Sequence, residues 1–316
     1  ASDGGGSIRM PAACCGLFGM KPSRGRTPMG PGRTEGWNGL STVHALSRSV
    51  RDNAALMDAT HGPETGSRYH APPPARPFLA ELDHDPKPLK IALWRTAPNG
   101  TKPDADAEGG LKYTANLLES LGHTVVEAAP QMDGEALGKA ALFTISANIA
   151  AMIDDRSKAL GRPVREDELE PITFSMAHLG RTVPMVELAH ANNAFQTAAI
   201  AYERFLDEGG FDMTLSATLS RAPEKLGVMA LTADRDTMGA AVASFTPHCP
   251  VFNQMGAPAM TVPLHWTAPT PTAPSGLPIG MMFGGRYGTE SLLFALAGQL
   301  ERAVPWARRR PPVWVG

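Results

Sequence analysis

Apolar residues recur at two spacings along this chain, and these spacings predict strands and helices that alternate. Residues 104–121 carry leucine and alanine on one helical face, and short apolar runs at 90–94 and 124–129 flank them. A strand–helix–strand unit of this kind favours a parallel strand pair with a right-handed crossover. The pattern therefore predicts an α/β fold.

The rest of the chain fits the same alternation. Glycine and proline punctuate residues 1–39, which predicts tight turns with little long helix, and the prolines of 69–88 predict an extended surface connection. Helical spacing is expected in three further segments, at 49–60, through most of 133–208 and at 289–300. Further strands are expected at 211–217, 260–266 and 279–283.

Composition narrows the class of protein. The 316 residues have a net charge of −2, which gives no electrostatic reason to expect nucleic acid or an anionic membrane as a partner. We find no apolar run long enough to span a bilayer and no metal-ligand spacing. Cys14, Cys15 and Cys249 are odd in number and two are adjacent, so they form no disulfide framework and indicate a reducing compartment. We therefore expect a cytoplasmic protein with no nucleic-acid or membrane partner.

The candidate chemistry lies in a glycine-rich run at the start of the chain. Gly4, Gly5 and Gly6 stand directly before Ser7. Glycine leaves the backbone free to turn its N–H groups toward a ligand. A serine placed there can attack a carbonyl carbon while those N–H groups bind the oxygen that becomes negative. An unperturbed serine also needs a base within hydrogen-bond reach, and the run itself supplies none.

The residues alone leave other interpretations of this run open. A phosphate-binding loop is disfavoured, because no Gly-Lys-Ser/Thr continuation follows and Pro11 comes soon after Ser7. A structural turn of small residues is the simplest alternative for an isolated glycine triplet.

The longer segment of residues 1–26 resembles, without gaps, the signature segment of the amidase signature family. Residues 49–55 resemble the helix after the signature loop, and 252–263 with 276–280 resemble the C-terminal pair of strands of bacterial members. Residues 130–245 match only loosely. The resemblance implies a mixed β-sheet core flanked by helices, in a single domain over residues 1–316.

The resemblance also implies a reaction and its residues. Family members hydrolyse amides through an acyl-enzyme, using a lysine, a serine on a cis peptide bond and a nucleophilic serine. Ser7 falls on the nucleophile, and Gly4, Gly5 and Gly6 fall on the oxyanion-hole N–H groups. Asp3 and Arg9 fall on polar positions that hold the loop in shape. No cofactor and no metal are implied.

Within the family, residues 36–41, 261–266 and 286–288 look most like bacterial amidases similar to 6-aminohexanoate-cyclic-dimer hydrolase. The implied partner is a small amide substrate, linear or cyclic, and a homodimer stays open. The chain begins at Ala1, and the family's lysine and cis-peptide serine lie upstream of the motif. We therefore expect a fragment that is inactive alone. One alternative is a non-catalytic, amidase-like module that binds a ligand or a partner chain, and another is a serine hydrolase that uses His44 or another histidine.

Other reactive residues are expected to be structural. Lys21 matches a family structural position and is not taken for the base. Spacing ties none of His44, His248 and His265 to Ser7, so we expect histidines with satisfied hydrogen bonds. Cys15 is expected to be a small buried residue beside the loop.

Overall fold

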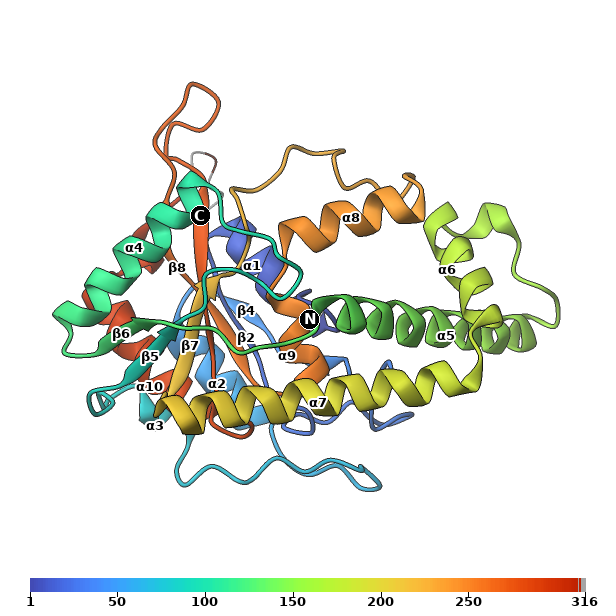
Figure 1. The fold of residues 1–316 in the computed structure, drawn as a ribbon, viewed down its shortest axis with the longest axis horizontal. Coiled ribbons are helices and arrows are strands. Elements are labelled where there is room, and N and C mark those ends of the chain that lie inside the picture. The colour runs from blue at the N-terminus through green and yellow to red at the C-terminus, as the bar shows by residue number, and fades with distance from the viewer. Residues whose placement is uncertain (312, 314–316) are drawn as a thin grey trace.

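The computed structural model describes residues 1–311 and 313. Its centre is a seven-stranded mixed sheet with the strand order β4-β2-β8-β9-β7-β5-β6 (Figure 1). The strands are β2 (Phe18–Lys21), β4 (Leu46–Ser47), β5 (Lys90–Leu93), β6 (Thr124–Glu127), β7 (Met213–Ala217), β8 (Ala259–Trp266) and β9 (Pro278–Gly284). The α/β class expected from the apolar spacing is thus confirmed.

The predicted strand–helix–strand unit is confirmed. β5 and β6 pair in parallel, and α4 (Ala105–Ser120) connects them. The Asp104 side chain accepts a hydrogen bond from the N–H of Ala107 and so caps this helix. β5 also pairs in parallel with β7, whereas all pairings from β7 to β4 are antiparallel.

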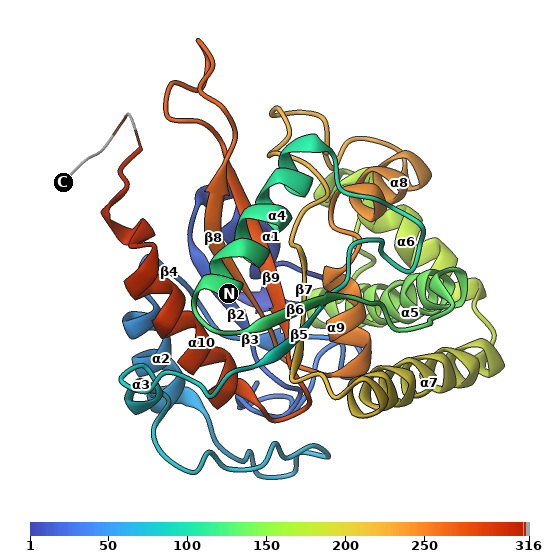
Figure 2. The same ribbon diagram turned by 60° about the vertical axis from the view of Figure 1, so that its left-hand side comes forward.

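Helices cover both faces of the sheet (Figure 2). Alternating side chains of the strands build a core on each face. Ile91 and Leu93 face α4, α2 (Val50–Thr60) and α10 (Glu290–Ala303), whereas Ala92 faces the opposite side. That side is covered by α9 (Cys249–Met255) and parts of α5 (Gly134–Leu160) and α7 (Met185–Gly209).

The long helices α5 and α7 extend beyond the sheet, with α6 (Pro171–Thr182) packed against α5 (Figure 1). The sequence predicted helix here without its length. α5 also corrects one expectation, because an 18-residue window in it has a mean hydropathy of 1.5 and is long and apolar enough to cross a membrane. A core helix of a soluble protein passes the same test of length and composition.

The structure differs from the predicted elements in several other places, and the short strand β2 was not predicted. The connection at 69–88 contains the short helix α3 (Phe78–Glu81), and α8 (Arg235–Phe245) was not predicted. Phe252 and Asn253, which were assigned with the C-terminal strand pair, lie in α9 instead. The reason is that α9 ends at Gly256, whose φ of +78° is left-handed, and the strand begins only at Ala259.

Candidate active site

Ser7 lies in the turn between β1 (Ser2–Asp3) and α1 (Arg9–Cys15), and it is exposed. β1 pairs with β3 (Thr42–Val43) in a separate two-stranded sheet, which fixes the start of the loop. Gly6 turns the chain with a φ of +126°, a conformation that side chains rarely tolerate. A Cβ at Gly6 would also lie 2.9 Å from the Cβ of Cys249, so both backbone and space require glycine.

The Asp3 carboxylate organises the loop from beneath. It accepts hydrogen bonds from the N–H groups of Gly6 (2.6 Å) and Ile8 (3.1 Å). It also accepts from Arg9 through Nε (3.0 Å) and Nη2 (3.1 Å). Asp3 and Arg9 are both completely buried, so water does not screen this ion pair. The loop on either side of Ser7 is therefore tied to one carboxylate.

Asn253 of α9 completes this network from the far end of the chain. Its Nδ2 donates to the backbone oxygen of Asp3 (2.7 Å), to the Asp3 carboxylate (2.9 Å) and to the oxygen of Leu40 (3.0 Å). Its Oδ1 accepts from Arg9 Nη2 (2.6 Å). We did not predict this role, although the resemblance at 252–263 marked the residue.

Both members of the buried pair stay charged. Burial by itself would raise the pKa of Asp3, but the Arg9 guanidinium outweighs it and holds that pKa well below its usual range. In the same way, burial favours a lower pKa for Arg9, and the Asp3 carboxylate raises it instead. A carboxylate that remains ionised keeps accepting the loop N–H groups across the pH range of ordinary assays.

The backbone N–H groups of the loop differ in whether they already donate a hydrogen bond within the protein. The N–H of Gly6 is occupied by Asp3, so Gly6 is not free to bind an oxyanion, contrary to its place among the three expected donors. Among the residues that the structure describes, no hydrogen bond is donated by the N–H of Gly4, Gly5 or Ser7. Gly4 and Gly5 remain the candidate donors.

No side chain of the described residues hydrogen-bonds to the Ser7 hydroxyl. Lys21 is fully buried and its Nζ donates to the backbone oxygen of Pro22 (2.7 Å), while burial lowers its pKa to about 7. His44 Nε2 lies 2.8 Å from Asn53 Oδ1, and burial lowers the pKa of His44 to about 4. A base for Ser7 therefore has no candidate within hydrogen-bond distance in this part of the chain.

Two expectations about structural residues need correction. His248 is buried against Trp94, with ring centroids 5.1 Å apart, but neither ring nitrogen has a hydrogen-bond partner among the described residues. The Nδ1 of His44 also lacks a partner there, so these histidines are only partly satisfied. Cys15 is exposed at the end of α1 rather than buried, because the helix turns its last residue to solvent.

An apolar cavity of about 550 Å³ adjoins the loop through two residues. Trp37 and Thr246 line it. A Cβ on Gly4 would lie 2.7 Å from the Trp37 ring, and a Cβ on Gly6 would lie 3.4 Å from Thr246 Oγ1. Trp37 has a φ of +51°, which is rare for a bulky residue and marks a strained turn beside the loop. Sequence reasoning missed both contacts.

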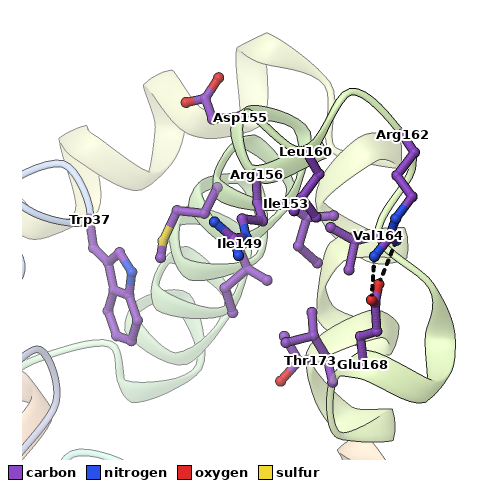
Figure 3. Close-up of a pocket in the computed structure, with 12 residues that line it drawn as sticks. Trp37, Ile149, Ile153, Asp155, Arg156, Leu160, Arg162, Val164, Glu168 and Thr173 are labelled. Atoms are coloured by element: carbon purple, nitrogen blue, oxygen red, sulfur yellow. Dashed lines mark hydrogen bonds and ion pairs between the residues drawn. The ribbon is translucent and has the colours of Figure 1, made fainter. Parts of the chain in front are cut away.

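Trp37 also borders a second cavity of about 830 Å³ (Figure 3). This cavity lies between α5 and α6, with Ile149 and Ile153 on one wall and the Arg162–Glu168 ion pair at the end away from Trp37. It is therefore a feature of the projecting helices, and it reaches the candidate active site only at the Trp37 ring.

Comparisons with known proteins show the family of the chain. The family model described as Amidase matches residues 1–294. The chain belongs to the Amidase family. Two relatives named 6-aminohexanoate-cyclic-dimer hydrolase, from Pseudomonas sp. (strain NK87) and Paenarthrobacter ureafaciens, are each 31% identical over 98% of this chain. The chain spans 64% of the length of each of these two relatives.

Solved structures place the fold in the same family. The structure of 6-aminohexanoate cyclic dimer hydrolase complexed with substrate superposes with a TM-score of 0.88 at 29% identity, covering 99% of this chain and 65% of that one. The peptide amidase PAM superposes with a TM-score of 0.75 at 21% identity, covering 99% and 64%, and shows the shared fold. The resemblance to the amidase signature family is thereby confirmed.

A metal centre has no candidate among residues 1–311 and 313. No group of three or more His, Cys, Asp or Glu side chains there could hold an ion.

Proposed function

We propose that this protein hydrolyses the carbon–nitrogen bond of small amides through an acyl-enzyme on Ser7. The observation that carries the proposal is an exposed serine on a glycine loop whose conformation is fixed by the buried Asp3–Arg9–Asn253 network. The same loop leaves the N–H groups of Gly4 and Gly5 without partners among the described residues. Family membership supports amide chemistry at this position.

The reaction follows from these groups. The Ser7 oxygen forms a bond to the amide carbon while the hydroxyl proton passes to a base, and the N–H groups of Gly4 and Gly5 bind the oxygen that becomes negative. The carbon–nitrogen bond then breaks as the amine takes up the proton. Water releases the carboxylate from Ser7 and restores the hydroxyl. One oxyanion donor contributes about 3–4 kcal/mol to such a step.

The substrate is a small amide, linear or cyclic, whose acyl part occupies the apolar cavity beside Trp37 and Thr246. The volume of about 550 Å³ and the aliphatic walls formed by Leu137, Ile145 and Val242 suit a hydrocarbon chain. Two relatives carry a cyclic amide dimer in their names, which supports including cyclic amides in the proposed substrate class.

The 316-residue chain alone is expected to hydrolyse amides slowly, because no base lies within hydrogen-bond distance of Ser7 among the described residues. A positioned base contributes about 10²–10⁴ in rate. Since Ser7 is exposed, a small external base such as imidazole can reach it. Imidazole is therefore expected to accelerate acylation of the chain.

Labelling with a fluorophosphonate tests this function. We expect slow modification of the peptide Ala1–Arg9, accelerated by imidazole and abolished by Ser7→Ala. Ser2→Ala is the matched control, because Ser2 is exposed in the same peptide and its variant should label like the parent. Label that persists in Ser7→Ala, or none even with imidazole, would overturn the proposal, and the second result would favour a non-catalytic binding module.

A further inference from the structure

A polar cavity of about 380 Å³ shares the lining residue Gln254 with the apolar cavity. The residues that define its chemistry are Arg24, Asn38, Arg68, Tyr69, Gln196 and Gln254. Asn38 follows Trp37 directly, and Gln254 lines both cavities. The polar cavity therefore adjoins the candidate active site without including Ser7.

Its positive charge is only partly offset by the protein, through Glu35. Arg24 donates to three backbone oxygens, from Nε to Gly39 (2.6 Å) and from Nη2 to Asn253 (2.8 Å) and Gln254 (3.0 Å). No carboxylate of the described residues forms an ion pair with Arg24. Burial accordingly lowers the pKa of Arg24. A partly buried guanidinium that forms no direct ion pair favours an anionic ligand.

A second guanidinium reinforces this charge. The Arg68 and Arg24 guanidinium carbons lie 5.8 Å and 5.2 Å from the centre of the Tyr69 ring. Arg68 also pairs with Glu35 through Oε1, so Glu35 offsets one of the two positive charges. The net charge beside the cavity remains positive.

Gln254 supplies an independent sign of a ligand. The residue is only 4% exposed, its Nε2 donates to the backbone oxygen of Leu137 (3.3 Å), and its Oε1 has no hydrogen-bond partner among the described residues. A buried amide oxygen without a donor costs free energy, which an N–H group of a ligand would recover.

We propose that this cavity binds the carboxylate group of a small molecule that also carries an N–H donor, such as an N-acylated amino acid. Arg24 and Arg68 bind the carboxylate, and Gln254 Oε1 accepts the N–H. This proposal rests on the proposed function, because that function is the reason to expect an amide in the ligand. It would give the protein a preference for amides that bear a carboxylate, because the cavity adjoins the loop through Asn253 and Gln254.

Calorimetric titration of the 316-residue chain carrying Ser7→Ala tests the proposal without turnover. N-acetylglycine offers both groups, N-acetylglycinamide lacks the carboxylate, and N-acetylsarcosine lacks the N–H. We expect N-acetylglycine to bind about tenfold more tightly than N-acetylglycinamide, as one retained charged contact would give. N-acetylsarcosine is expected to bind more weakly than N-acetylglycine, and added salt to weaken carboxylate binding.

Substitutions locate the site. Arg68→Gln is expected to weaken N-acetylglycine about tenfold, whereas Arg51→Gln, an exposed arginine outside the cavity that also pairs with an acid, should leave binding unchanged. At Arg24 the variant is Arg24→Lys, because it keeps a positive charge where a neutral replacement could unfold the chain. Equal binding of the acid and its amide, absence of binding, or an unaffected Arg68→Gln variant would overturn the proposal. Because Ser7 is absent from these titrations, their failure is separate from failure of the labelling experiment.

Discussion

At the scale of single residues, the environment of Asp3 explains why a glycine loop holds one shape. Three flexible glycines would sample many conformations, and each ordered residue costs about 1–2 kcal/mol of backbone entropy. Asp3 opposes this cost by accepting N–H groups on both sides of Ser7. Arg9 and Asn253 then fix Asp3 itself.

Replacing Asp3 by Asn should therefore be severe. The change leaves the Arg9 guanidinium buried without its counter-ion, and removal of one partner of a buried ion pair costs about 3–5 kcal/mol. Urea denaturation measures the loss. Asp52→Asn removes an exposed ion pair with Arg51 and should cost about 0.2–1 kcal/mol. Equal losses in the two variants would show that the buried pair does not organise the loop.

Lys21 predicts a dependence of stability on pH. Burial lowers its pKa to about 7, below the value near 10.4 expected for an unfolded chain. Between these values the unfolded state binds a proton that the folded state lacks, so this group makes folding more favourable as pH rises. The free energy of unfolding of the parent, relative to Lys21→Met, should increase between about pH 7 and pH 10.

Denaturation of both proteins across this pH range gives the comparison. Lys158→Met is the control, because that side chain is 79% exposed, and its difference from the parent should stay constant. A constant difference for Lys21→Met as well would contradict the prediction.

At the scale of elements, the contact between α5 and α6 depends on one close approach. A Cβ at Gly180 of α6 would lie 2.0 Å from the backbone oxygen of Ser146 in α5, so Gly180→Ala must push the helices apart. Overpacking of this kind costs about 1–3 kcal/mol. Gly138→Ala in α5 meets no atom within 4 Å and should stabilise by up to about 1 kcal/mol. Thermal melts of the two variants should shift in opposite directions.

The sequence predicted those elements whose apolar residues follow one period. The unit from β5 to β6 and the strands β7, β8 and β9 appear where periodicity placed them. Helix α9 was missed because it is seven residues long and almost wholly buried, so no polar face marks its period. The short β2 was missed because glycine and proline surround it.

The site was predictable only in part, for a similar reason. Ser7 and its glycines are contiguous, so a local motif reveals them. Trp37, Thr246 and Gln254 reach the site through tertiary contacts, and no spacing along the chain links them to Ser7. The sequence likewise does not reveal that the Gly6 N–H donates to Asp3 and so is not free for a ligand.

At the scale of the whole molecule, the sheet and the projecting helices are stabilised by apolar cores of different size. β8 and β9 are covered by apolar side chains on both faces, whereas α6 packs on a small cluster that includes Ala150, Ile153 and Ala177. Local opening is easiest where few apolar contacts are lost. Hydrogen exchange should therefore be faster in α6 than in β8 and β9, and similar protection of both regions would contradict this expectation.

The bonds between Asp3 and Asn253 join residues that are 250 positions apart. During synthesis the Ser7 turn leaves the ribosome long before its anchor in α9 has been made. Ser7 is thus translated well before the residue that anchors its loop, and the loop can reach its final geometry only after α9 has packed against it. Nascent chains that stop short of α9 should carry the serine without the ability to use it.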